Sequence, residues 1–178
     1  MRSPIKIALS SRAKVGTVCG IAAVGLTAAA LFSGIPAFAT PGSNFSVIRA
    51  SVGSFTEIDA RADKTGTWDA YLRTKDTSTI GVDLLTIRTG GSSGWHTHGG
   101  ITLVTVKQGQ VAVTDGDDCS TKVYQAGEGF VDRGGSHRHY VSNPYGLTAE
   151  LVAVQIRPLG SPGRIDADAP AKIGRAHV

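Results

Sequence analysis

The sequence predicts an all-β domain, either a sandwich or a barrel. Short runs rich in β-branched residues recur at close spacing, and Gly-rich turns separate them. No segment long enough for a helix keeps a 3.6-residue apolar period. Many short strands joined by tight turns are typical of closed or two-layered antiparallel folds.

The first 39 residues have the pattern of a secretory signal peptide. A basic start precedes an apolar, Ala-rich run, and this run ends in Ala37-Phe38-Ala39. A membrane anchor is the alternative, and the glycines that interrupt the run disfavour it. We therefore expect a secreted or extracytoplasmic protein that starts at Thr40 and has no stable membrane anchor after cleavage.

Charge and cysteine content narrow the classes of partner. The basic residues of the leader are Arg2, Lys6, Arg12 and Lys14, and they account for the whole formal charge of +4. A balanced remainder without a basic stripe predicts no nucleic-acid partner. Only Cys119 remains after the leader, so the domain has no internal disulfide and depends on core packing.

Along the mature chain, residues 40–53 are small and polar and predict a loose N-terminal arm, followed by one domain over 54–159. Asp115-Gly116 is a hairpin signal, and the Gly-rich stretch 90–94 predicts a strand end. Residues 160–178, with their Pro and Gly, predict a flexible tail. We expect strands at 68–72, 80–87, 101–106, 111–113, 122–125, 129–132, 137–141 and 149–156.

Two histidine clusters stand out. His96 and His98 are two residues apart, so on a strand they point to the same face. His139 lies on another expected strand, two residues after His137. Three imidazoles brought together across a barrel can hold one divalent ion, such as Fe, Zn, Mn or Ni. The alternative is that they are polar strand-edge residues without a role.

The glycines around these histidines complete a pattern that resembles the cupin superfamily. The closest similarity is to small exported single-domain bacterial cupins of the type-2, quercetin-dioxygenase-like kind. The first motif is represented by Gly90, His96, His98 and Gly109, and the second by Gly127, Gly135, His139 and Asn143.

The resemblance implies a single-domain double-stranded jelly-roll β-barrel that binds one metal ion through His96, His98 and His139. It implies a dioxygenase or an isomerase acting on a small oxygenated molecule. A non-catalytic binding or sensing module and a purely structural metal are the alternatives. Its partners are then a small-molecule ligand and, in a homodimer, a second copy of the chain.

The sequence departs from the family pattern in three places. Thr102 stands where the motif has glutamate, and Arg133 stands where it has proline. One extra residue separates Gly135 from His139, which raises the question of whether His137 is the ligand; the spacing to Asn143 favours His139.

Three further side chains have two interpretations each. Thr102 either orients a metal-bound water or is an ordinary strand residue. Trp95 either walls a substrate pocket or packs in the core. His137 belongs to the site's surroundings or faces outward. Asp132 and Glu128 are candidate bases for which surface positions are favoured.

Overall fold

A computed structural model describes residues 40–63 and 65–171 of the protein, so the predicted signal peptide lies outside the described residues. Among the described residues, no helix is long and apolar enough to cross a membrane. The strands are β1 (Ser43–Phe55), β2 (Asp59–Arg61), β3 (Tyr71–Arg73), β4 (Ser78–Thr97), β5 (Ile101–Gln108), β6 (Gln110–Asp115), β7 (Thr121–Gln125), β8 (Gly129–Asp132), β9 (His139–Asn143), β10 (Ala149–Pro158) and β11 (Ile165–Asp166).

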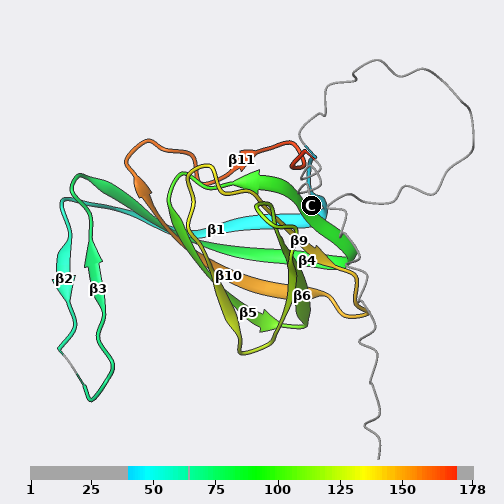
Figure 1. Ribbon diagram of the computed structural model, residues 1–178, viewed down its shortest axis with the longest axis horizontal. Coiled ribbons are helices and arrows are strands. Elements are labelled where there is room, and N and C mark those ends of the chain that lie inside the picture. The colour runs from blue at the N-terminus through cyan, green and yellow to red at the C-terminus, as the bar shows by residue number, and fades with distance from the viewer. Residues whose placement is uncertain (1–39, 64, 172–178) are drawn as a thin grey trace, which may run out of the picture.

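Nine of these strands form one curved antiparallel sheet, and the predicted all-β barrel is confirmed (Figure 1). Its strand order is β7-β6-β9-β4-β10-β5-β8, and β1 and β11 also pair with β4. The other two strands, β2 and β3, make a separate hairpin that projects away from the barrel (Figure 1). The predicted strand at 68–72 is therefore only partly right, because β3 begins at Tyr71 and Trp68 lies in the exposed turn of the hairpin.

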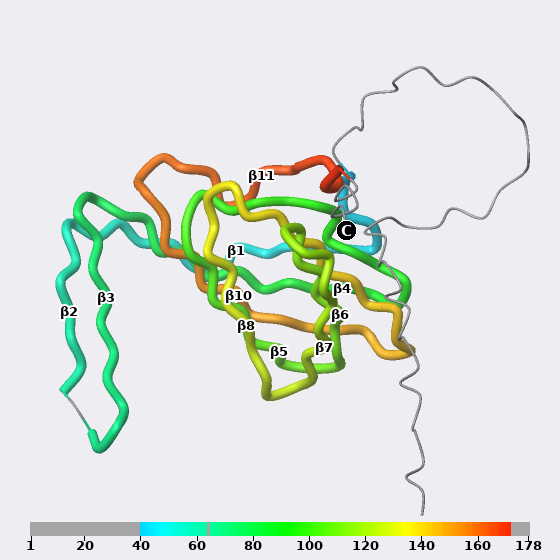
Figure 2. The backbone as a smooth tube through the Cα atoms, in the orientation of Figure 1, coloured from blue at the N-terminus to red at the C-terminus, as the bar shows by residue number. Residues whose placement is uncertain are grey.

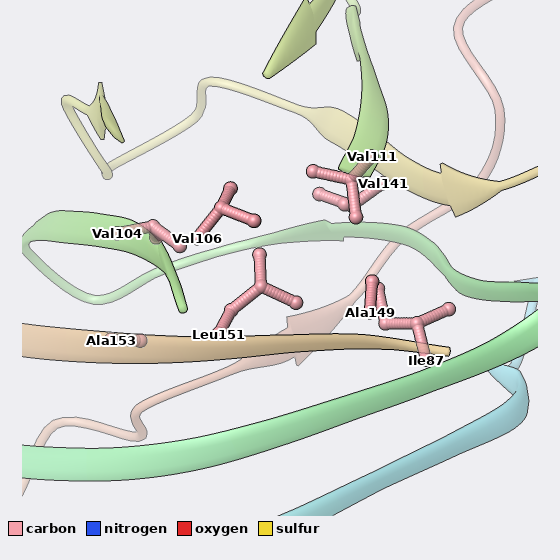
Figure 3. Packing of buried hydrophobic residues seen from close by; sticks show 8 residues of the cluster. All are labelled: Ile87, Val104, Val106, Val111, Val141, Ala149, Leu151 and Ala153. Carbon is pink, nitrogen blue, oxygen red and sulfur yellow. The ribbon is translucent and has the colours of Figure 1, made fainter. Parts of the chain in front are cut away.

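The barrel core follows from strand alternation. On β5, Val104 and Val106 face inward and are buried, whereas Leu103 and Thr105, at the alternate positions, are exposed. Figure 3 shows these inward side chains meeting those of the neighbouring strands. The cluster comprises Ile87, Val104, Val106, Val111, Val141, Ala149, Leu151 and Ala153.

The long strand β4 joins the two halves of the barrel. Its first part pairs with β10 and its last part with β9, and the register shifts between Ser92 and Trp95. The Gly-rich stretch 90–94 was predicted to end the strand, and that prediction is wrong. Gly90 and Gly94 adopt positive φ angles of 72° and 69°, so they bend the strand without ending it.

The prediction of a loose arm over 40–53 is wrong. This segment forms most of β1, which pairs antiparallel with β4 from Ser43↔Ser92 to Phe55↔Ser78. The serines suggested a loose chain, but Phe45, Val47 and Arg49 occupy every second position and line the cavity inside the barrel. The alternation supplies an inward-facing side, which is what a strand on a barrel requires.

The prediction of a flexible tail over 160–178 is also wrong for its described part. Ile165 and Asp166 form β11 against the end of β4, and the Ala167 N–H donates to the Trp95 carbonyl at 3.0 Å. The Thr40 N–H in turn lies 3.4 Å from the Ala167 carbonyl, so the two ends of the described chain meet (Figure 2). Residues 172–178 lie outside the described part.

Candidate metal centre

The fold brings His96, His98 and His139 to one place. His96 lies in β4 and pairs directly with His139, the first residue of β9, while His98 follows the end of β4. All three side chains are buried. The ring centroids of His96 and His139 are 4.2 Å apart, and the other two distances are 4.9 and 5.2 Å. One nitrogen of each ring lies within 4.8 Å of the others, so this group could hold one ion.

Main-chain carbonyl groups orient the two rings of the His96/His98 pair. His96 Nδ1 is 2.9 Å from the Gly94 carbonyl, and His98 Nδ1 is 2.6 Å from the Gly163 carbonyl. A carbonyl only accepts, so each Nδ1 carries the proton and leaves Nε2 with a free lone pair. The positive φ of Gly94 helps to position its carbonyl, and a Cβ there would lie 1.9 Å from the Thr40 carbonyl oxygen.

A carboxylate lies behind the third ring. His139 Nδ1 is 2.8 Å from Asp132 Oδ2, although the angle is outside hydrogen-bond geometry. Asp132 ends β8 and is only 2% exposed, so the interpretation of Asp132 as a surface residue is wrong. It pairs with Thr102 across the sheet, and strand parity on β8 could have placed it inside because Val131 faces outward.

The position of His137 favours His139 in the register question. His137 Nδ1 bonds to Asp132 Oδ2 at 2.6 Å and its Nε2 to Asp115 Oδ2 at 3.1 Å, so both ring nitrogens are occupied. The predicted strand at 137–141 in fact begins at His139, which leaves His137 and the extra residue in the preceding loop. His137 thus contacts the candidate centre through Asp132.

The ionisation of the histidines suits metal binding. Burial, with a smaller contribution from the charges of His139 and Arg164, lowers the pKa of His96 to about 2. Burial also lowers the pKa of His98, against the bond to the Gly163 carbonyl. Both rings are therefore neutral at pH 7, which is the form that binds a metal.

At Asp132 and His137, hydrogen bonds and nearby charges outweigh the effect of burial on the pKa. Burial would raise the pKa of Asp132, but contacts with His139 and His137 outweigh it and hold that pKa below its ordinary value. For His137, burial lowers the pKa, and bonds to Asp132 and Asp115 outweigh this effect and raise it. Asp132 is thus an anion next to the rings.

Thr102 and Trp95 were both candidates for the surroundings of the site, and only Thr102 lines the cavity. Thr102 is 1% exposed and lines the same cavity as the three histidines, and within the described part of the chain its Oγ1 has no hydrogen-bond partner. Trp95 alternates with His96, so it points to the other side of β4 and packs on Tyr140 at 5.6 Å between ring centroids. Its interpretation as a pocket wall is wrong, and the core alternative is right.

The cavity beside the histidines has a volume of about 280 Å³ and a mainly apolar lining. Part of that lining comes from the two segments predicted to be loose. Phe45, Val47 and Arg49 of β1 contribute one side, and Gly163 and Arg164 of the tail contribute another. The cavity also contains Asp83, whose two carboxylate oxygens pair with Arg49. The sequence did not predict these residues as part of the site. Those of β1 are marked only by alternation within a Ser-rich segment, and Arg164 is a single arginine in a segment rich in Gly and Pro.

These residues fit a divalent metal ion. Three buried imidazoles converge, protein groups face their Nδ1 atoms, and a hydroxyl without a partner among the described residues lies in the same cavity. Three protein ligands are the usual set of a zinc site that keeps a position open for water or substrate. The donor set does not determine which metal binds.

The match to a protein family agrees with the fold. Residues 83–155 match the family described as Cupin domain, and no curated protein sequence matches the chain. An oxalate oxidase in complex with the substrate analogue glycolate is similar at 22% identity and a TM-score of 0.47. That match covers 70% of this chain and 55% of the oxidase.

Two further solved structures are similar. A cupin superfamily protein from Desulfitobacterium hafniense shares 12% identity at a TM-score of 0.40, and the match covers 62% of this chain and 82% of that protein. A conserved protein of unknown function from Streptococcus pyogenes shares 19% identity at a TM-score of 0.39, covering 44% of this chain and 65% of that one. This chain therefore spans less than two thirds of the oxidase and of the streptococcal protein.

Proposed function

Because this chain carries a cupin domain, we propose that it binds one divalent metal ion through His96, His98 and His139 and acts on a small oxygenated molecule. Fe, Zn, Mn and Ni all suit imidazole nitrogen. The observation that carries the proposal is the arrangement of three buried imidazoles whose Nδ1 atoms all face protein oxygens. Such fixed rings are the usual supports of a metal site.

The metal would supply Lewis acidity and open positions for an oxygen ligand. The chain's own contribution is to fix the rings, exclude water and present Thr102 Oγ1 to the cavity. With threonine in place of the motif glutamate, all three ligands are neutral, and the ion keeps its full charge for the bound ligand. Asp132 offsets part of that charge from behind His139.

The cavity favours a dioxygenase over an isomerase. An isomerase that moves a proton needs a base within reach of the substrate. Among the described residues lining the cavity, the carboxylate is Asp83, and Arg49 already engages it. Chemistry at the metal needs no such base. A non-catalytic binding or sensing module with the same centre is the second candidate, since a mainly apolar cavity also suits simple capture.

The experiment is metal analysis of the purified protein, followed by oxygen uptake. We expect about one equivalent of metal per chain. Oxygen consumption with small oxygenated substrates that depends on the metal would support the enzyme, and ligand binding without consumption would support the binding module. Protein that holds no metal after reconstitution with Fe, Zn, Mn and Ni contradicts both.

Export is part of the same proposal. Mass spectrometry of the native protein should find an N-terminus at or near Thr40, because Ala37-Phe38-Ala39 is a suitable cleavage site. A protein that retains Met1 and stays in the cytoplasm would contradict secretion, without affecting the proposed metal site.

A further inference from the structure

Three buried polar atoms around the cavity lack a partner among the described residues. They are Thr102 Oγ1 on β5, Gln155 Oε1 on β10 and Arg164 Nη1 just before β11. All three residues line the cavity that holds the histidines. Leaving a buried polar atom unpaired is unfavourable, so three of them around one cavity indicate a polar ligand.

Arg164 is held in place by its other atoms. Nη2 donates to the Ser93 carbonyl at 2.6 Å, and Nε donates to Asp166 Oδ1 at 2.8 Å. The guanidinium carbon lies 5.7 Å from the centre of the Phe45 ring. These contacts fix the guanidinium group before any ligand arrives and leave Nη1 as the free donor. A pre-fixed donor binds a ligand without a large loss of side-chain freedom.

The charges around the cavity favour an anion. The charges of Arg49 and Asp83, which line the cavity as an ion pair, compensate each other. Arg164 has a carboxylate partner in Asp166, but that carboxylate is half exposed and its charge is screened by water. With a divalent ion on the histidines, the interior is positive even with Asp132 behind His139.

The size and donors restrict the class of anion. A volume of about 280 Å³ lies below the roughly 300–1,000 Å³ of sites for drug-sized ligands. One free guanidinium nitrogen suits a carboxylate, whereas phosphate sites gather donors from several groups. The amide of Gln155 presents its oxygen or, turned by half a rotation, its NH₂ group, and so suits a second oxygen of the ligand.

We infer that the cavity binds a small hydroxy or oxo carboxylate whose carboxylate accepts a hydrogen bond from Arg164 Nη1. Thr102 and Gln155 contact the remaining oxygens. The inference rests on the proposed function for the metal, which the same ligand would reach with an oxygen atom. The contact between the ligand and Arg164 does not require the metal.

The test is isothermal titration of the protein with lactate, pyruvate and acetate, with acetamide and inorganic phosphate as comparisons. It is run both metal-loaded and after chelator treatment, and metal content is measured separately. We expect the carboxylates to bind more tightly than acetamide and phosphate. Arg164→Gln should weaken carboxylate binding by about 10- to 100-fold, as expected for one hydrogen bond to a charged group, and leave metal content unchanged.

Matched variants separate this role from a structural one. Arg164→Lys keeps the charge and should recover part of the affinity, and Arg88→Gln, which removes an exposed arginine, should have no effect. Gln155→Glu is close in shape to the wild type but adds a negative charge to the cavity, so it should also weaken carboxylate binding. This variant provides the test if Arg164→Gln fails to fold.

Two results would overturn the inference. One is equal affinity for acetate and acetamide, or tighter binding of phosphate. The other is a folded Arg164→Gln or Gln155→Glu variant that binds lactate as the wild type does. Loss of metal from the wild type would instead count against the proposed function, and carboxylate binding by chelator-treated protein would still test Arg164.

Discussion

The two histidine clusters of this chain are supported in different ways. Backbone carbonyls of Gly94 and Gly163 hold His96 and His98, whereas carboxylates contact His137 and His139. The first cluster is therefore oriented by main-chain acceptors, which no truncation of a side chain removes. The second cluster depends on the Asp132 carboxylate, so a single substitution at Asp132 removes the contact to both of its histidines. The backbone therefore orients the rings of one half of the centre, and side chains support the rings of the other half.

The largest expected effect is the loss of a ligand from either cluster. His139→Ala removes one of three donors and leaves the cavity beside Asp132 open to water, so the variant should lose the metal. His96→Ala should do the same from the other cluster. Metal content after dialysis, with circular dichroism as a check on folding, measures both. A folded His139→Ala protein with one full equivalent of metal would exclude His139 as a ligand.

The next largest effect sharpens the contrast between the clusters. Asp132→Asn keeps the shape of the side chain and removes the charge behind His139, so the ring loses its anionic support. Metal affinity should fall by about 10- to 100-fold, the usual cost of losing a group that orients a ligand. Competition with a chelator measures it.

No equivalent substitution exists for the His96/His98 pair, because its acceptors are main-chain atoms. The matched control for Asp132→Asn is Asp117→Asn, which removes an exposed carboxylate paired with Arg133. The control should bind metal normally. Equal losses in both variants would mean that the effect comes from net charge and not from contact with His139.

Acid should change the stability contributions of the His96/His98 pair and of His137 in opposite directions. The pKa of His96 and of His98 is lowered in the folded protein, so the unfolded chain takes up their protons first as pH falls below about 6.5. The metal-free fold should therefore lose stability, by up to about 1.4 kcal/mol per pH unit for His96. The raised pKa of His137 works in the other direction, because its contribution is present below about 6.5 and is lost as pH rises through the raised value.

Thermal unfolding of chelator-treated protein between pH 7 and pH 5 measures this balance. The midpoint should fall toward pH 5, and it should fall more steeply in His137→Gln, which lacks the opposing contribution. Asp132 adds little in this window, because its pKa is lowered from 3.8 and its effect is lost only in stronger acid. A midpoint that rises toward pH 5 in the wild type would contradict the buried, neutral state of His96 and His98.

The sequence was sufficient to predict the barrel and the convergence of the three histidines, because strand alternation and motif spacing are local signals. It was not sufficient for the walls of the cavity. Phe45 and Arg164 lie in segments whose composition indicates loose chain, and they become ordered only through pairing with β4, far away in sequence. Asp132 was missed for a related reason, since a carboxylate is expected at the surface unless its partners are known.

The smallest expected effect is that of replacing His137. It tests whether His137 only supports the second cluster or is itself a metal ligand. His137 bonds to Asp132 Oδ2, but Asp132 Oδ1 also accepts the Gly134 N–H at 2.7 Å and His139 remains beside it. His137→Gln should therefore leave Asp132 in place and lower metal affinity by less than about tenfold, below the usual cost of losing a group that contacts a ligand. It should cost roughly 1 kcal/mol of stability through the lost hydrogen bonds. The same chelator competition and thermal unfolding measure both. If His137→Gln loses the metal while His139→Ala keeps it, His137 is the third ligand and the extra residue lies on the other side of the motif histidine.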